Sequence, residues 1–294
     1  MGHTGVHRFA GAGLAIAAIL ACIGAASSAV SADDGEAVKQ LRQAVNNPAR
    51  SSADKARDQY RHPVETLSFF GIRPDMTVVE VWPFGGWYTA ILAPYLREHG
   101  KLYAAAMDPD SKDPEDLQYN RELHALFAAH PELFDKVELS VLAPGKKMQL
   151  APDGSADMVL TFRNIHNWVW DGTQKEVFAA IYRALKPGGI LGVVEHRNND
   201  PNFVPRKSGE AYTGEQYAIK LAESVGFRFV ARSQINSNPK DTKDYPKGVW
   251  TLPPSYALGD KDRAKYAAIG ESDRFTLKFV KPLLPRAPTA APRP

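Results

Sequence analysis

The segment that follows residue 162 carries four polar side chains within five residues, namely Arg163, Asn164, His166 and Asn167. It comes directly after an apolar run that is typical of a buried strand. The unperturbed pKa of a histidine is about 6.5, so His166 could act as a general base that removes a proton from an N–H or O–H group. Asn164 could hold a polar ligand. The alternative is that both asparagines only cap the following helix and that His166 only donates a hydrogen bond to a carbonyl.

A second polar group, Glu195-His196-Arg197, ends another apolar run. If the two runs are neighbouring parallel strands, their carboxyl ends meet at one edge of the sheet, and Glu195 and His196 approach His166. Such a set could be an acid–base pair with a carboxylate that orients it, or two histidines and a carboxylate around a metal. The spacing contains no local metal-binding motif, so we predict no bound metal. The alternative for residues 195–197 is a solvated strand end or a single salt bridge.

A strand, a glycine turn and a helix follow one another in the first half of the chain. The β-branched run Thr77–Val81 predicts a buried strand, which Pro83, Gly85 and Gly86 end. A helical spacing of apolar side chains begins directly after them. Open α/β sheets place a nucleotide-like ligand at such a turn, because glycine lets the backbone come close and the helix N-terminus offers free N–H groups. A plain turn without a ligand is the alternative interpretation.

Apolar runs and helical patterns alternate along most of the chain. Seven strands are predicted, at 77–82, 102–107, 137–142, 157–162, 190–195, 227–233 and 275–281, with helices at 86–98, 115–129, 174–185 and 210–224. This alternation is typical of right-handed βαβ units. We therefore predict an α/β, Rossmann-like fold with a seven-stranded, mostly parallel sheet and helices on both faces. The last two strands lack a helix between them, so we expect a C-terminal antiparallel hairpin around an insertion at 236–272.

This order of elements, over roughly residues 60–281, resembles the class I S-adenosylmethionine-dependent methyltransferases. Four local pieces carry the resemblance: Glu80 before the glycine turn, Asp108 at the end of the second strand, Asp157-Met158-Val159-Leu160 in the fourth, and Leu185-Lys186-Pro187-Gly188-Gly189-Ile190-Leu191 before the fifth. The stretch from Val79 to Thr89 also resembles a bacterial branch of predicted exported methyltransferases.

The resemblance implies transfer of a methyl group from S-adenosylmethionine to a small-molecule substrate. Asp108 would bind the ribose of the cofactor and, with Glu80, hold its adenosyl end. Arg163 would bind the cofactor from the exit of the fourth strand, and His166 would take the proton of the substrate. The candidate catalytic residues are then His166, Asn164, Glu195 and His196.

The first motif of that family reads acidic-x-Gly-x-Gly-x-Gly, and this chain departs from it. Trp82 stands at the first glycine and Phe84 at the second, whereas Gly86 matches the third and has Gly85 beside it. The two aromatic side chains either fill the adenosine space or turn to stack on the adenosine, so Trp82, Gly85 and Gly86 are candidate cofactor-binding residues. The alternative function is a methyltransferase-like fold that has lost cofactor binding and serves as an exported ligand-binding or metal-dependent protein.

Aromatic side chains near these segments have two interpretations. Trp168, Trp170 and the aromatic insertion, with Trp250, could form an apolar wall for a substrate. Tyr88 could point into the site, and Tyr212 could close its substrate side. Packing against the core is the alternative for each.

Residues 1–32 are predicted to be a secretory signal peptide. Arg8 is their only Lys or Arg, residues 9–26 are uncharged, and Val30-Ser31-Ala32 forms a small-residue cleavage site. We predict cleavage after Ala32 and export, to the periplasm. The alternative is an uncleaved N-terminus that anchors the protein in a membrane.

Cys22 is the only cysteine of the chain. It follows Ile19-Leu20-Ala21, which loosely resembles a lipoprotein cleavage box, so lipid attachment at Cys22 is a further alternative. After cleavage at residue 32 the mature chain would have no disulfide, no cysteine zinc site and no thiol nucleophile. The absence of a free thiol suits an oxidising compartment.

The remaining chain divides into three parts by composition: a polar, Ala-rich helical arm at 33–60, a methyltransferase-like domain at 61–281, and a Pro-rich tail at 282–294 that we expect to be disordered. The formal net charge of the 294 residues is +3, and basic and acidic side chains are interspersed. We therefore expect a small molecule, and not a nucleic acid, as the partner. The sequence leaves the oligomeric state open.

Overall fold

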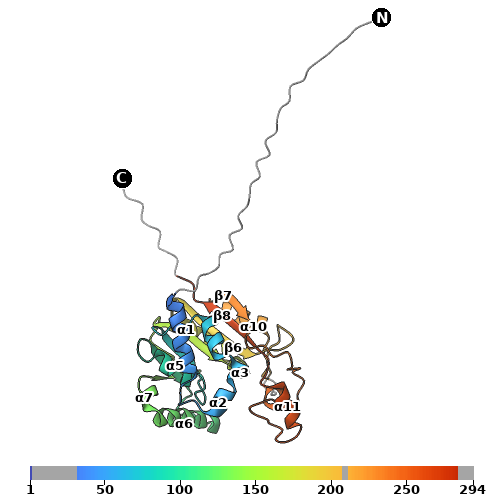
Figure 1. Ribbon diagram of the computed structural model, residues 1–294, viewed down its shortest axis with the longest axis horizontal. Helices are drawn as coiled ribbons and strands as arrows, with labels where there is room; N and C mark the ends of the chain where they lie inside the picture. The colour runs from blue at the N-terminus through green and yellow to red at the C-terminus, as the bar shows by residue number, and fades with distance from the viewer. Residues whose placement is uncertain (2–31, 207–210, 284–294) are drawn as a thin grey trace.

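The computed structural model describes residues 1, 32–206 and 211–283, which form an eight-stranded sheet with helices on both faces (Figure 1). The strand order is β4-β3-β2-β1-β5-β6-β8-β7. The strands are β1 (Thr77–Val81), β2 (Lys101–Ala106), β3 (Glu138–Ala143), β4 (Lys147–Gln149), β5 (Ala156–Phe162), β6 (Leu185–His196), β7 (Arg228–Ser233) and β8 (Arg274–Val280).

Four helices precede the first strand: α1 (Ala32–Val45), α2 (Ser52–Ala56), α3 (Asp58–Arg61) and α4 (Pro63–Phe70). The others are α5 (Thr89–Leu96), α6 (Pro114–Ala129), α7 (Pro131–Phe134), α8 (Ile165–Trp170), α9 (Gln174–Ala184), α10 (Glu215–Glu223) and α11 (Arg263–Ile269), with a 3₁₀ turn η1 at Gly248–Thr251. Helices α1 and α5 lie side by side over one face of the sheet (Figure 1).

The predicted Rossmann-like fold is confirmed. Strands β1, β2, β3, β5 and β6 are parallel, and β8 pairs antiparallel with both β6 and β7. The strand count was wrong by one, because β4 adds a short antiparallel edge beside β3. Only three residues long, with Met148 between Lys147 and Gln149, β4 carries too short an apolar pattern to be recognised in a sequence.

Two apolar cores lie on the two faces of the sheet. Alternate residues of β1 divide between them: Val78 packs with α1, α4 and α5, whereas Val79 and Val81 pack with α9 and α10. All three side chains are at most 1% exposed. Burying a valine side chain fully stabilises the fold by about 1.5–3 kcal/mol, so this alternation fixes which way β1 faces.

The insertion between β7 and β8 carries secondary structure of its own, η1 and α11, the latter at the margin of the molecule in Figure 1. The carboxylate of Asp241 ties the start of the insertion to its end, because it accepts a hydrogen bond from the Asp273 backbone N–H (2.7 Å). The same carboxylate accepts a hydrogen bond from the hydroxyl of Tyr212, which lies before the insertion (3.0 Å). Asn238 donates to the carbonyls of Ile269 and Glu271. The insertion is therefore built onto the sheet through buried polar contacts.

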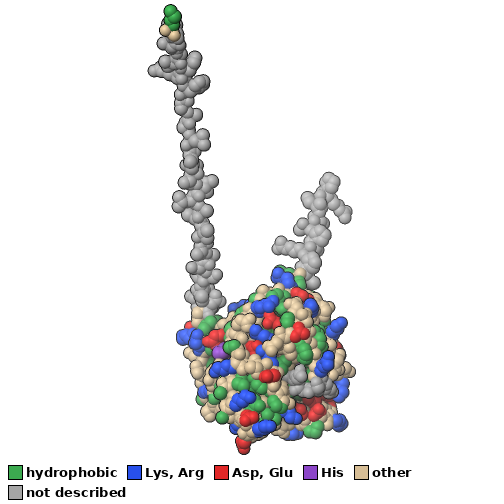
Figure 2. All heavy atoms as spheres, turned by 90° about the vertical axis from the view of Figure 1, so that its right-hand side faces the viewer, with side chains coloured by type: hydrophobic (Ala, Val, Ile, Leu, Met, Phe, Trp, Pro, Cys, Tyr) green, Lys and Arg blue, Asp and Glu red, His purple; other side chains and the backbone are tan. Residues whose placement is uncertain are grey.

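No helix within the described ranges is long and apolar enough to cross a membrane. Most of the predicted signal peptide (1–32) and most of the Pro-rich tail (282–294) fall on residues 2–31 and 284–294, outside the described residues. On the face shown in Figure 2, basic and acidic side chains are interspersed, as the sequence predicts.

Candidate active site

The carboxyl ends of β5 and β6 bring His166, Glu195 and His196 together, as predicted. The two strands are parallel neighbours in which Phe162 pairs with Val194, so their exits lie next to each other. One nitrogen or oxygen atom from each of the three side chains lies within 4.8 Å of the others.

Glu195 holds His166 in place. Its carboxylate is fully buried. The Oε1 atom lies 3.1 Å from His166 Nδ1 and accepts a hydrogen bond from the His196 backbone N–H at 2.7 Å. The Oε2 atom accepts a hydrogen bond from the Ile165 backbone N–H at 2.7 Å. A carboxylate only accepts hydrogen bonds, so Nδ1 of His166 carries the proton and Nε2 is left as the basic atom. The alternative of a solvated strand end at 195 is wrong. Because Glu195 already serves three N–H donors, the set suits acid–base chemistry better than metal binding.

His196 faces a second group of polar residues. Its Nδ1 lies 2.6 Å from the Ser272 hydroxyl oxygen, and its ring centroid lies 5.5 Å from that of His166. Burial, followed by the charges of His166 and Arg163, lowers the pKa of His196 well below its ordinary value. His196 is therefore a neutral imidazole at neutral pH.

Asn164 joins the exits of β5 and β1. Its Nδ2 donates to the Val81 carbonyl (2.9 Å) and to the Thr161 hydroxyl (3.0 Å), so it does not cap α8 with its side chain. The side chain is 1% exposed, and its Oδ1 has no hydrogen-bond partner among the described residues. A buried acceptor left free is costly, so this oxygen suits a donor on a ligand.

Two tryptophans form an aromatic wall beside the histidine. The ring centroids of Trp170 and Trp250 lie 5.0 Å and 6.3 Å from that of His166, and 5.8 Å from each other. The buried Nε1 of Trp170 has no hydrogen-bond partner in the described part of the chain. Trp168 does not belong to this wall, because it is fully buried in the core. Tyr88 is also buried and stacks on Phe162, with ring centroids 3.5 Å apart.

The glycine turn holds two aromatic residues, as well as Gly86, in the left-handed region. The φ angles are +46° at Trp82, +49° at Phe84 and +80° at Gly86, all in the left-handed region. That region costs a residue with a side chain about 1–2 kcal/mol, so packing has to hold both aromatic residues there. Trp82 Nε1 donates to the Leu142 carbonyl at 2.9 Å, and the Phe84 ring lies 4.7 Å from that of Tyr119. The two aromatic side chains thus pack on β3 and α6.

Helix α6 covers the glycines of the turn. A methyl group on Gly86 would lie 2.5 Å from Leu126 Cδ2, and one on Gly85 would lie 3.4 Å from Glu122 Oε2. Gly86 is therefore favoured by its positive φ, and a side chain there would also displace the end of Leu126 on α6. The structure places both glycines under α6.

The two predicted acidic cofactor residues lie at the ends of β1 and β2. Glu80 is 2% exposed and accepts a hydrogen bond from the Thr89 hydroxyl at 2.6 Å. Burial raises its pKa to about 7. Asp108 accepts the Asp110 backbone N–H at 3.1 Å and pairs with Lys146 Nζ at 3.1 Å, and these contacts lower its pKa.

Arg163 takes a left-handed φ of +65° at the exit of β5, where its N–H donates to the Val194 carbonyl. Burial lowers the pKa of its guanidinium to about 10. The guanidinium makes no hydrogen bond or ion pair with any residue that the structure describes.

Sequence reasoning missed the residues that the end of the insertion brings to this edge, chiefly Glu271, Ser272 and Arg274. Ser272 is separated from His196 by 76 positions, so no local spacing could reveal the pair. The one available signal is the run of polar residues at 271–274 directly before an apolar strand.

The donors and acceptors at this edge fit S-adenosylmethionine. Asp108 suits ribose hydroxyls, and the free Oδ1 of Asn164 suits an amino group.

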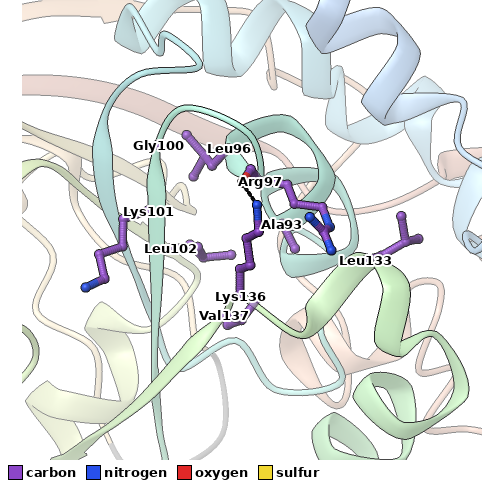
Figure 3. A pocket seen from close by; sticks show the side chains of 9 residues that line it. All are labelled: Ala93, Leu96, Arg97, Gly100, Lys101, Leu102, Leu133, Lys136 and Val137. Atoms are coloured by element: carbon purple, nitrogen blue, oxygen red, sulfur yellow. Dashed lines mark hydrogen bonds between the residues drawn. The ribbon is translucent and has the colours of Figure 1, made fainter.

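Two cavities lie away from this edge. The first, of about 10 Å³, lies between the end of α5 and the start of β3, where Lys136 Nζ donates to the Arg97 carbonyl at 3.1 Å (Figure 3). It has room for about one water. The second, of about 350 Å³, lies at the opposite edge of the sheet, between Met76, Asp157 and Ile190 at the amino ends of three strands. Neither belongs to the candidate active site.

Comparison with known proteins agrees with this geometry. Residues 86–193 match a family model described as a methyltransferase domain. This match runs from the glycine turn to the fifth parallel strand and includes His166, Asn164 and Asp108. No curated protein matches the chain.

A solved structure shares the fold. A SAM-dependent methyltransferase from Aquifex aeolicus superposes with a TM-score of 0.52 at 16% identity, over 83% of this chain and 98% of that one. A SAM-dependent methyltransferase from Methanosarcina mazei gives a TM-score of 0.48 at 14% identity, over 74% of this chain and 97% of that one. At this identity the first comparison establishes a methyltransferase-type fold.

Proposed function

We propose that this protein transfers a methyl group from S-adenosylmethionine to a small-molecule acceptor, and that it does so after export. The methyltransferase family match over residues 86–193 supports the reaction class. The observation that carries the proposal is the pair of His166 and Glu195, with Nδ1 and Oε1 3.1 Å apart at the carboxyl edge of the sheet. A general base at this edge is what methyl transfer to an N–H or O–H group uses.

The residues of the edge divide between binding and proton transfer. Asp108 would hold the ribose, and the Oδ1 of Asn164 would accept a hydrogen bond from the amino group of the cofactor. When bound, S-adenosylmethionine supplies an electrophilic methyl group on a sulfonium. Holding the acceptor in line with that methyl group would provide much of the rate enhancement.

His166 would receive the proton of the acceptor at Nε2. The Glu195 carboxylate would stabilise the imidazolium that forms, because its Oε1 accepts the Nδ1–H in a buried site where charge interactions are strong. The neutral His196 beside it would not repel that charge. Trp170 and Trp250 would exclude water from the acceptor side of His166.

Calorimetric titration of S-adenosylmethionine and S-adenosylhomocysteine into the full-length protein tests the proposal. We expect dissociation constants of tens of micromolar or tighter, or about −6 to −7 kcal/mol. Asp108→Ala should abolish the heat, and Asp75→Ala, which removes an exposed carboxylate elsewhere, should not. No heat from the wild-type protein at millimolar ligand would refute the proposal.

Export is tested separately. N-terminal sequencing of protein recovered from the periplasm should begin at Asp33, the residue after the proposed cleavage site. A protein that keeps residues 1–32, or that carries lipid on Cys22, would instead establish a membrane-anchored form.

A further inference from the structure

Three arginines surround one buried carboxylate where the N-terminal helices meet the end of the insertion. Glu271 accepts from Arg57 Nε at 2.6 Å, Arg61 Nε at 3.1 Å and Arg274 Nη2 at 2.8 Å. The side chains of Glu271, Arg61 and Arg274 are 5%, 4% and 2% exposed. The Arg57 side chain is 25% exposed, so two buried positive charges and one partly exposed positive charge share one buried negative charge. This leaves a positive excess that a buried site tolerates poorly.

Arg163 adds a fourth positive charge beside this cluster, because its backbone N–H donates to the carbonyl of Val194, which pairs with Thr276, two residues after Arg274. Burial, followed by the charge of Arg163, lowers the pKa of Arg61 well below its ordinary value. Burial, followed by the charge of Arg274, likewise lowers the pKa of Arg163. Glu271 is the carboxylate that counters them, and its hydrogen bonds go to the other three arginines. No hydrogen bond or ion pair engages the Arg163 guanidinium among the described residues, so its N–H donors are available to an anion.

The arginine cluster is continuous with the candidate active site. Ser272 connects them, because its hydroxyl oxygen lies 2.6 Å from His196 Nδ1 and its carbonyl accepts from Arg274 Nε at 3.0 Å. His196 and Arg274 are also paired across β6 and β8. Arg163 precedes His166 by three residues on the same strand exit.

We propose that Arg163, with Arg61 and Arg274, binds a carboxylate of the methyl acceptor, so that the substrate class is a planar organic acid. The inference rests on the proposed methyl transfer. The rings of Trp170 and Trp250 lie beside His166 and would pack against a planar body. Bidentate binding of carboxylates is the geometry to which a guanidinium is suited.

Charge balance assigns the carboxylate to the acceptor and not to the cofactor. The carboxylate of S-adenosylmethionine balances only its own amino group, so the bound cofactor adds the positive charge of its sulfonium to a site that already has an excess. An acceptor with a carboxylate reduces that excess.

The test uses benzoate and benzamide as a matched pair of probes, one anionic and one neutral. Each is titrated calorimetrically into the full-length protein, with and without saturating S-adenosylhomocysteine. We expect benzoate to bind about tenfold or more tightly than benzamide. Arg163→Gln should remove this preference, and Arg228→Gln, which removes an exposed arginine at the start of β7, should retain it. Equal binding of the two probes to the wild-type protein, or a preference unchanged in Arg163→Gln, overturns the proposal.

A second pair of ligands identifies the source of the anion. S-adenosylhomocysteine has the amino-acid carboxylate, and 5′-methylthioadenosine lacks it. If Arg163→Gln weakens S-adenosylhomocysteine about tenfold and leaves methylthioadenosine unchanged, the cluster serves the cofactor and the proposal is wrong. Equal affinities in the variant and the wild type support it.

The two proposals fail in different ways. If the wild-type protein binds neither S-adenosylmethionine nor S-adenosylhomocysteine but prefers benzoate through Arg163, the methyltransferase proposal fails and the anion site stands. If the cofactor binds and the benzoate preference is absent, only the anion site fails.

Discussion

The Nδ1 of His166 lies 3.1 Å from Oε1 of Glu195, and the same carboxylate accepts the backbone N–H groups of Ile165 and His196. Glu195 therefore fixes the tautomer of the proposed base and also holds the first turn of α8 against the end of β6. One buried residue thus contributes both to the chemistry of the site and to its stability.

Replacing Glu195 by alanine should strongly destabilise the protein, because it leaves three buried N–H donors without an acceptor. Removing one partner of a buried charged pair typically costs about 3–5 kcal/mol of unfolding free energy. Urea denaturation followed by circular dichroism measures this loss. Glu223→Ala, at an exposed position on α10, should stay within about 0.5 kcal/mol of the wild type. A loss for Glu195→Ala as small as that of Glu223→Ala would contradict the described contacts.

The sequence was sufficient to predict that His166, Glu195 and His196 meet. Each follows an apolar run, and parallel strands that are neighbours in the sheet must expose their ends at one edge. The strand order needed for this is a property of βαβ units and does not depend on details of side-chain packing.

Contacts made through the insertion were beyond sequence reasoning. Glu271 is 210 positions from Arg61, and their ion pair depends on how the insertion folds back over the edge of the sheet. Likewise, residues with a side chain disfavour a positive φ, so the sequence predicts a negative φ at Trp82 and Phe84. Contacts with β3 and α6 hold both residues at a positive φ, which is a tertiary effect that propensity does not contain.

Glu80 should make the protein less stable as the pH rises. Burial raises its native pKa to about 7, against about 4.3 for an unfolded glutamate. Between these values the native carboxyl keeps a proton that the unfolded chain has lost. Its contribution to stability is therefore fully present below about pH 4.3 and is lost as the pH rises through 7, by roughly 4 kcal/mol in all.

Comparison of Glu80→Gln with the wild type isolates this effect. Glutamine cannot ionise, so the variant should gain stability relative to the wild type between pH 5 and pH 8, as measured by urea unfolding at each pH. Glu65→Gln, at an exposed position on α4, should follow the wild type throughout. A difference between Glu80→Gln and the wild type that does not change with pH would show that Glu80 is ionised in the native protein.

His196 should make the protein less stable as the pH falls, which is the opposite of the effect of Glu80. Burial and the charge of His166 lower its native pKa well below the value of about 6.5 in the unfolded chain. The unfolded state therefore takes up a proton below pH 6.5 that the native state does not, and the native state loses stability as the pH falls. Its contribution is fully present above about pH 6.5.

NMR titration of the histidine rings checks this directly. The His196 signals should show no protonation between pH 8 and pH 5.5. His196→Gln should also lose less stability than the wild type between pH 7 and pH 5.5. Titration of His196 at an ordinary pKa would show that the positive cluster around it is more solvated than the structure indicates.

Gly86 should tolerate substitution much less well than Gly85, although the two are adjacent in the same turn. Alanine at 86 would need a φ of +80° and would bring its methyl group 2.5 Å from Leu126 Cδ2 on α6, so we expect a loss of about 2–4 kcal/mol of unfolding free energy. At 85 the nearest atom lies 3.4 Å away at the end of a glutamate side chain, which can move, and the cost should be below about 1 kcal/mol.

Leu126→Ala should recover part of the loss at 86 by removing the steric overlap, while the backbone strain remains. Urea unfolding of Gly85→Ala, Gly86→Ala, Leu126→Ala and the Gly86→Ala, Leu126→Ala double variant measures these effects, the last three as a double-mutant cycle. Equal losses at 85 and 86 would mean that α6 does not pack on the turn.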